Sequence, residues 1–128
     1  TGVVSLNVPA AYTASYYIAI RHRSGIVTVS AAPVPFNTPT VSYSFNTPTA
    51  AYGSNMMQTG DGFTAFFSGD VNQDGVIDTA DMTPVDNGSA DYLGGYRNPD
   101  VNGDGIIDTA DMTLVDNNSN NYISAATP

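Results

Sequence analysis

Acidic side chains recur at a fixed spacing in the second half of the chain, and this spacing is typical of a metal-binding loop. The segment DVNQDGVIDTADMTPVDNGSADY begins at Asp70, and DVNGDGIIDTADMTLVDNNSNNY begins 30 residues later at Asp100. Aligned without gaps, 17 of the 23 positions are identical. Four carboxylates this close in sequence repel one another unless a cation lies among them. The doubled pattern therefore predicts two cation sites of one design.

Calcium is the cation that this donor set favours, because calcium takes roughly six to eight hard oxygen ligands in a flexible geometry. Each segment resembles the 12-residue EF-hand loop, with Asp or Asn at positions 1, 3, 5, 9 and 12 and Gly at position 6. Position 7 contributes its backbone carbonyl. Magnesium fits less well, since it prefers fewer protein ligands and a rigid octahedron. The predicted ligands of the two ions are Asp70, Asn72, Asp74, Val76, Asp78, Asp81, Asp100, Asn102, Asp104, Ile106, Asp108 and Asp111.

The alternative interpretation of the loops is a solvated acidic turn with no ligand. Two copies in the same register argue against it, because a turn needs fewer carboxylates than each loop carries. Position 12 is Asp where the common EF-hand motif has Glu. The following helix must therefore come closer to the ion for its carboxylate to reach it.

Composition excludes several other classes of function. The 128 residues contain 12 acidic and 3 basic side chains, for a formal charge of −9, so nucleic acid is not expected as a partner. The absence of Cys and the single His22 exclude thiolate and multi-His zinc sites. No apolar run approaches the roughly 20 residues of a membrane helix, so we expect no membrane insertion.

Catalysis is not expected either. The chain has no Lys, Cys or Glu, and we interpret His22 as an exposed strand residue. An activated nucleophile or a general base therefore lacks a plausible partner. We assign no catalytic residue.

The first half of the chain has the alternation of apolar and polar residues that is typical of half-buried β-strands. We expect strands within residues 4–8, 16–20, 27–29, 41–45 and 63–67, with a tight hairpin at Ser24-Gly25. The sequence FNTPT occurs at 36–40 and 45–49, where Asn-Thr-Pro favours turns between strands. The composition changes near Ser68, so we predict two domains, 1–68 and 69–128. The predicted class is α+β, with a small and incomplete antiparallel β-sandwich-like domain followed by two calcium loop-helix units.

Each predicted loop leads into a short helix. We expect the helices from Thr79 to about Asn87 and from Thr109 to about Asn117, with Pro84 kinking or shortening the first. Ile77 and Ile107 should pair and tie the two loops together, and Tyr92 and Tyr122 should close the module. The predicted buried face of the helices consists of Met82, Val85, Met112, Leu114 and Val115.

The stretch from Asp70 to Tyr122 resembles a dockerin module, which also carries two tandem DVNGDG-type loops with Asp at position 12. The resemblance implies calcium binding and docking onto a cohesin. Dockerins often have Ser-Thr at loop positions 10 and 11, where this chain has Thr79-Ala80 and Thr109-Ala110.

The whole chain is similar to the C-terminal ends of secreted surface proteins of Bacteroidetes-type bacteria, which carry a strand like Ser15–Arg23 before a dockerin-like pair. This similarity implies an extracellular or cell-surface location. Because the sequence begins at Thr1 and shows no signal peptide, we expect a processed or partial chain. Asp78-Thr79-Ala80 and Asp108-Thr109-Ala110 resemble a bacterial O-glycosylation motif, so a glycan is a further candidate partner.

Two functions remain open from the sequence. One is a non-enzymatic calcium-binding structural subunit that forms a homo-oligomer or helical polymer by exchanging its N-terminal strand. The other is a dockerin-type module that anchors a larger secreted protein or enzyme to a cohesin-like or surface partner.

Overall fold

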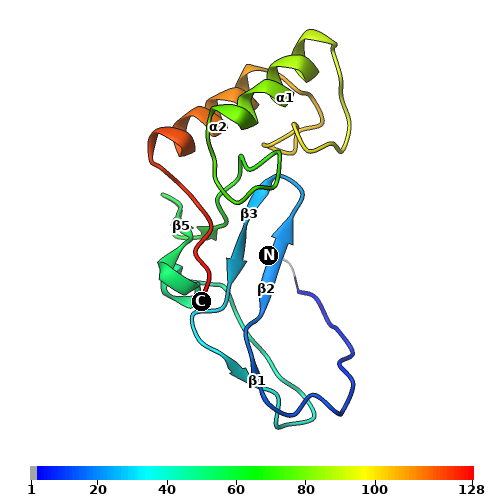
Figure 1. The fold of residues 1–128 in the computed structure, drawn as a ribbon, viewed down its shortest axis with the longest axis vertical. Helices are drawn as coiled ribbons and strands as arrows, with labels where there is room; N and C mark the ends of the chain where they lie inside the picture. Colours follow the sequence, from blue (N-terminus) through cyan, green and yellow to red (C-terminus); the bar gives the residue numbers. More distant parts are fainter. Residues whose placement is uncertain (1–2) are drawn as a thin grey trace.

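The computed structural model describes residues 3–128 and has an α+β architecture (Figure 1). Within these residues, three small antiparallel sheets of two strands each precede two packed helices. The helices lie at one end of the molecule and strand β1 lies near the other (Figure 1). The α+β class predicted from the sequence is confirmed at this level. The elements are β1 (Ser15–Tyr16), β2 (Ala19–His22), β3 (Gly25–Val29), β4 (Val34–Pro35), the 3-10 turns η1 (Pro48–Ala50) and η2 (Tyr52–Ser54), β5 (Met57–Gln58), β6 (Thr64–Ala65), α1 (Thr79–Ala90) and α2 (Thr109–Asn120).

The hairpin of β2 and β3 lies between the helices and β1, and the segment around β5 lies beside it (Figure 1). Its register pairs Ala19 with Val29 and His22 with Gly25, so the turn is Arg23-Ser24, one residue earlier than predicted. Gly25 is required by close packing, because a Cβ there would lie 2.9 Å from the carbonyl oxygen of Phe67. The predicted hairpin and the exposed position of His22 are confirmed.

Two predicted strands are wrong. Residues 4–8 and 41–45 are described by the structure and form no strand. Residues 4–8 have no neighbouring strand to complete a ladder, and their apolar side chains are exposed. The second segment is held through aromatic side chains instead. The Tyr43 hydroxyl bonds to the backbone at Ala31 and Ala50, and Phe45 packs edge-on against Phe66.

The predicted strand at 16–20 is divided between two sheets. Its first residue, Tyr16, belongs to β1, which pairs with the unpredicted β4, and its last two residues, Ala19 and Ile20, belong to β2. The predicted strand at 63–67 is shorter than expected, because only β6 pairs with β5. The two Asn-Thr-Pro segments are bends or turns as predicted, with a bend at Thr38-Pro39 and η1 beginning at Pro48.

Both helices start with the same reciprocal cap. In α1, Asp78 Oδ1 accepts a hydrogen bond from Ala80 N at 2.7 Å, and Asp81 Oδ2 accepts one from Asp78 N at 3.0 Å. This capping box satisfies amides that the first helical turn leaves without partners. Both helices run three residues past the predicted ends, to Ala90 and Asn120, and Pro84 does not shorten α1.

Both helices end in a Schellman motif with Tyr at the left-handed position. In α1, Leu93 N donates to Gly88 O and Tyr92 N donates to Ser89 O, and α2 repeats the pattern at Tyr122 and Ile123. Tyr92 and Tyr122 have φ values of 51° and 55°. Their side chains are 95% and 90% exposed, so the expectation that they close the module is wrong. At this position the backbone turns the chain while the side chain points into solvent.

The two loops do not pair with each other as expected. Ile77 N donates to Ile123 O at 2.9 Å, and Ile107 N donates to Leu93 O at 3.3 Å. Each loop is therefore held by the residue that follows a Schellman turn. Loop 1 (residues 70–81) is held by the far end of the chain, and loop 2 (residues 100–111) is held by the exit of α1. The expected Ile77–Ile107 pairing is wrong, because the amides of these two residues bond instead to Ile123 and Leu93, the residues that follow the two helices.

The buried core joins the two halves. It contains Ile26 of β3 together with residues of both loops and both helices, namely Val71, Ile77, Val85, Val101, Ile107 and Val115. Met82, Met112 and Leu114 pack against this cluster, which confirms the predicted buried face of the helices. Within residues 3–128, neither helix is long and apolar enough to cross a membrane.

Neighbouring isoleucines in loop 2 give a direct test of this core. Ile107 is 3% exposed and Ile106 is 60% exposed. Ile107→Ala should lower the free energy of unfolding by about 2–5 kcal/mol, because it leaves a cavity. Chemical denaturation in the presence of calcium measures the change.

Ile106→Ala removes the same atoms from solvent-exposed space and is the matched control, with an expected change within about 0.5 kcal/mol. Equal effects of the two substitutions would contradict the described core.

Candidate metal centre

The position-12 carboxylates close the two loops. Asp81 Oδ1 accepts hydrogen bonds from Val71 N at 2.7 Å and Asn72 N at 3.0 Å, in addition to the Asp78 bond of the cap. Asp111 accepts the equivalent three bonds in loop 2, at 2.7, 2.9 and 3.0 Å. Both residues are 0% exposed. Three charge-assisted bonds satisfy each buried carboxylate and draw the start of the loop onto its helix.

Positions 3, 5 and 7 form a tight turn with the same bonds in both loops. In loop 1, Asn72 Oδ1 accepts from Asp74 N at 2.8 Å, and Asp74 Oδ1 accepts from Val76 N at 2.9 Å. In loop 2 the equivalent distances are 2.8 Å and 2.8 Å. The side chains of Val76 and Ile106 are 43% and 60% exposed, as suits positions whose predicted donor is the backbone carbonyl.

Position 1 of loop 1 carries an oxygen with no protein partner. Asp70 is 2% exposed, and its Oδ2 accepts from Gly75 N at 3.1 Å. Its Oδ1 is buried and has no hydrogen-bond partner within residues 3–128. Burial raises the pKa of the Asp70 carboxyl, the Gly75 hydrogen bond opposes this rise, and the nearby carboxylates of Asp81 and Asp74 add to it. Loop 1 therefore holds an uncompensated negative charge that a cation would neutralise.

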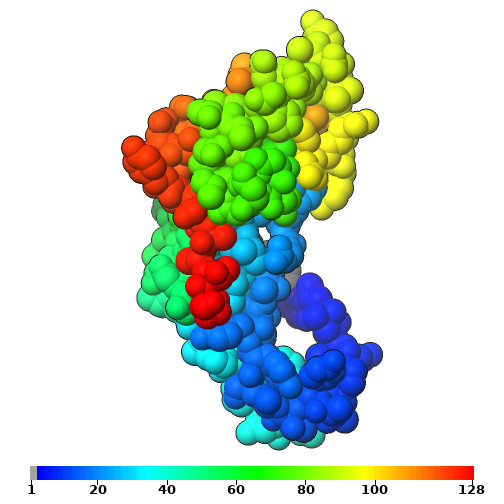
Figure 2. All heavy atoms as spheres, in the orientation of Figure 1, coloured from blue at the N-terminus to red at the C-terminus, as the bar shows by residue number. Residues whose placement is uncertain are grey.

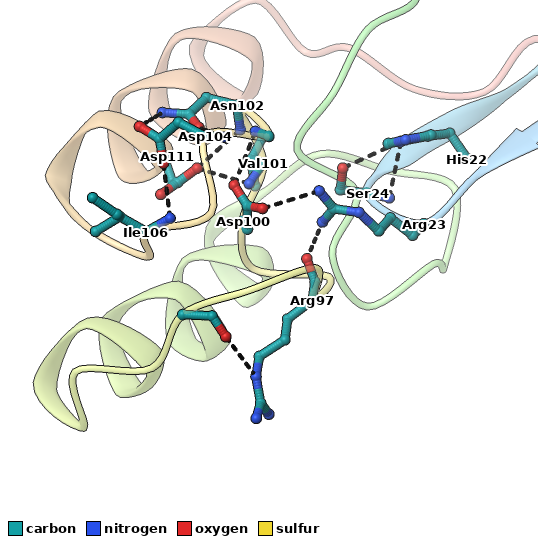
Figure 3. A network of polar contacts seen from close by, with 12 residues as sticks. His22, Arg23, Ser24, Arg97, Asp100, Val101, Asn102, Asp104, Ile106 and Asp111 are labelled. Carbon is teal, nitrogen blue, oxygen red and sulfur yellow. Dashed lines mark hydrogen bonds and ion pairs between the residues drawn. The ribbon is translucent and has the colours of Figure 1, made fainter.

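Position 1 of loop 2 is partnered differently. Asp100 Oδ1 accepts from Gly103 N at 2.9 Å, and Asp100 Oδ2 lies 3.3 Å from Arg23 Nη2 (Figure 3). Arg23 comes from the turn of the β2–β3 hairpin and also donates to the carbonyl of Arg97. The two loops thus share backbone geometry but differ in the electrostatics of position 1.

The predicted ligands lie within their loops, but their carboxylates point mainly to backbone amides. Across residues 3–128, no three His, Cys, Asp or Glu side chains converge as they would around a bound metal ion. Asp70 and Asp74 line a cavity of about 230 Å³. The remaining lining residues are Arg21, Val27, Gln73, Gly75 and Ala125. The donors of both loops are oxygens, and the unpartnered Asp70 Oδ1 fits a hard cation.

Arg23 is the residue of the candidate site that the sequence did not indicate. It lies 77 residues from Asp100 in the chain, and no local pattern reports such a contact. The composition gives one indication: with 12 acidic and 3 basic side chains, each Arg is expected to pair with a carboxylate. The composition does not indicate which carboxylate pairs with Arg23.

Comparisons with known proteins add no relative to this picture. No protein-family model, no curated protein and no solved structure matches the chain.

Asp70 and Asp100 both occupy loop position 1, but replacing each with Asn should change the stability of the calcium-free fold in opposite directions. The raised pKa of Asp70 means that the calcium-free fold loses stability as pH rises from the ordinary Asp pKa through the raised value. At neutral pH in EDTA, Asp70→Asn should therefore retain more helical circular dichroism signal, or unfold at a higher temperature, than the parent.

Asp100→Asn is the matched control, because it removes the charge that pairs with Arg23 and should lower stability under the same conditions. If Asp70→Asn destabilised the chain as much as Asp100→Asn does, loop 1 would not hold an uncompensated charge.

Proposed function

We propose that the protein binds two calcium ions through its two loops and acts as a non-enzymatic structural protein outside the cell. The observation that carries the proposal is the buried Oδ1 of Asp70, which has no partner in the described part of the chain although it belongs to a repeated all-oxygen donor set. A buried charge without a partner is costly to the fold, and a divalent cation removes that cost.

The residues that would hold each ion are the carboxylates and amides at positions 1, 3, 5, 9 and 12 and the carbonyl at position 7. When bound, calcium would supply positive charge at the centre of each loop and no redox chemistry. The loop residues would supply oxygens, and Gly75 and Gly105, with φ values of 92° and 86°, permit the sharp bend between positions 5 and 7. The position-12 carboxylates would then link each ion to the first turn of its helix.

Calcium removal gives the first test. Because the loop carboxylates repel one another without a cation, EDTA should remove most of the helical circular dichroism signal, and calcium should restore it. Asp74→Ala should weaken binding to loop 1 more than about tenfold, since even loss of an outer-shell partner costs about that much.

Asp104→Ala is the matched change in loop 2, and each variant should leave the other loop's binding step visible in calorimetry. Dissociation constants as weak as about 10⁻⁴–10⁻³ M remain consistent with an extracellular module. An unchanged spectrum in EDTA, together with no heat of calcium binding, would sink the proposal.

A filament assembled by strand exchange is the structural role that we propose. Val4, Leu6 and Val8 are 79%, 80% and 48% exposed, although they alternate with polar residues as in a strand. Figure 2 shows the N-terminal segment, in blue, along the edge of the β-half, with a gap between part of it and the body of the molecule in this view. Strand β2 pairs only with β3, and its other edge has no strand partner among the described residues. An unpaired edge readily accepts a strand from another chain.

Strand exchange would also complete the β-half. The finer fold that we propose is an incomplete sandwich-like domain joined to a dockerin-like pair of loops. Donation of residues 3–8 to the next copy would bury exposed apolar side chains and extend a small sheet. Head-to-tail donation that does not close gives a helical polymer. Two bound calcium ions would change the formal charge from −9 by +4 to −5, lowering repulsion between subunits.

The alternation within the N-terminal segment supplies the test. Leu6→Asp should abolish polymers, because the donated strand must bury Leu6, whereas Ser5→Asp adds the same charge on the opposite face and should preserve them. Size-exclusion chromatography and negative-stain microscopy with calcium detect the difference. Polymers that persist in Leu6→Asp would exclude strand exchange through this segment.

Attachment to a cohesin-like or surface partner is the second candidate. It is supported by a shallow depression across both helices, lined by Met82, Thr109, Met112, Thr113 and Asp116. Dockerin-like modules would present helix surfaces of this kind to a partner. A calcium-loaded chain that stays monomeric at all concentrations favours attachment, and a filament favours the structural subunit.

A further inference from the structure

We infer that Arg23 makes the two calcium loops unequal, so that loop 1 fills first and loop 2 fills in competition with the β2–β3 hairpin. The inference rests on the calcium binding proposed above and adds a residue outside both loops that sets the affinity of one of them. Its basis is the different environment of Asp70 and Asp100, which occupy position 1 of otherwise equivalent loops.

The guanidinium of Arg23 is fixed on three sides. Its Nη2 lies 3.3 Å from Asp100 Oδ2, its Nη1 donates to the carbonyl of Arg97, and its Cζ lies 4.2 Å from the ring centroid of Tyr96. The side chains of Arg23 and Asp100 are only 11% and 2% exposed. Figure 3 shows the guanidinium between Asp100 and the Arg97 backbone, while the Arg97 side chain points away. An ion pair this buried is screened little by solvent or salt.

The same hairpin contacts loop 1 through Gly25, the first residue of β3, and this contact is neutral. Gln73 Nε2 lies 3.3 Å from Gly25 O and 2.6 Å from Asp70 O, so no cation reaches the Asp70 carboxylate through this contact. Position 4 of loop 2 is Gly103, which has no side chain to make such a bridge. The two loops thus differ where they face the hairpin. Loop 1 meets it through the neutral side chain of Gln73, and loop 2 meets it through the charged guanidinium of Arg23.

This arrangement sets the order of loading. Loop 1 offers calcium a buried Asp70 oxygen that has no hydrogen-bond partner in the described part of the chain. In loop 2 both oxygens of Asp100 are engaged, one by Gly103 N and one by Arg23. Calcium at loop 2 must therefore share Asp100 with a guanidinium or displace it, and either event opposes binding. Displacement also releases the ion pair that joins the hairpin to loop 2, so filling the second site changes the contact between the halves.

Calorimetry on the full-length chain isolates the effect. In an Asp74→Ala background, which leaves loop 2 as the intact site, Arg23→Gln should tighten calcium binding by at least about fivefold, the lower end of typical coupling between sites. Arg97→Gln is the charge-matched control, because its side chain bonds to Gly94 O and not to the loop carboxylates, and it should have a much smaller effect. Arg23→Lys retains the charge and should stay close to the parent.

If the Asp74→Ala background does not fold, the parent chain provides the second measurement. There, Arg23→Gln should narrow the gap between the two stepwise dissociation constants. Unchanged or weaker binding in Arg23→Gln, or an equal effect of Arg97→Gln, would overturn the role of Arg23 while leaving calcium binding intact. Absence of calcium binding in the parent and in every variant would overturn both proposals.

Discussion

Two buried carboxylates, Asp81 and Asp111, set the geometry on which the C-terminal half depends. Each is fully enclosed, and each accepts three backbone N–H bonds, two from the start of its loop and one from the helix cap. A carboxylate in this position is tolerated only when its oxygens are satisfied, so the loop must fold back onto the helix. The helix then starts at a fixed residue, and this start places Val85 or Val115 on the helix face that is buried in the shared core.

The closed loops are joined to each other by the helix exits. The Schellman turns at Tyr92 and Tyr122 redirect the chain so that Leu93 and Ile123 accept the amides of the two loop isoleucines. The C-terminal segment continues past loop 1, where Ala125 N donates to Gly75 O, and reaches β3 through the Thr28–Ala126 bridge. A single segment therefore contacts loop 1 and the β-half, and the β2–β3 hairpin contacts both loops.

The parts of this structure that the sequence predicts are those governed by local spacing. The 12-residue loop pattern, the helix starts at Thr79 and Thr109, the buried helix valines and the β2–β3 hairpin, apart from a shift of one residue in its turn, all follow from residues close in the chain. The predictions of strands at 4–8 and 41–45 are wrong, because alternation of apolar and polar residues indicates that a segment could bury one face. It does not indicate that a partner strand is present. The pairing of Ile77 with Ile123 and of Arg23 with Asp100 depends on contacts across 46 and 77 residues, which no single-sequence pattern encodes.

Native mass spectrometry of the full chain, titrated with calcium, tests the central claim most directly because it counts ions. The account predicts a species carrying two calcium ions as the saturated form, and a species carrying one calcium ion when either Asp74 or Asp104 is changed to Ala. A parent chain that binds no calcium, or whose calcium count does not fall in either variant, would contradict the account.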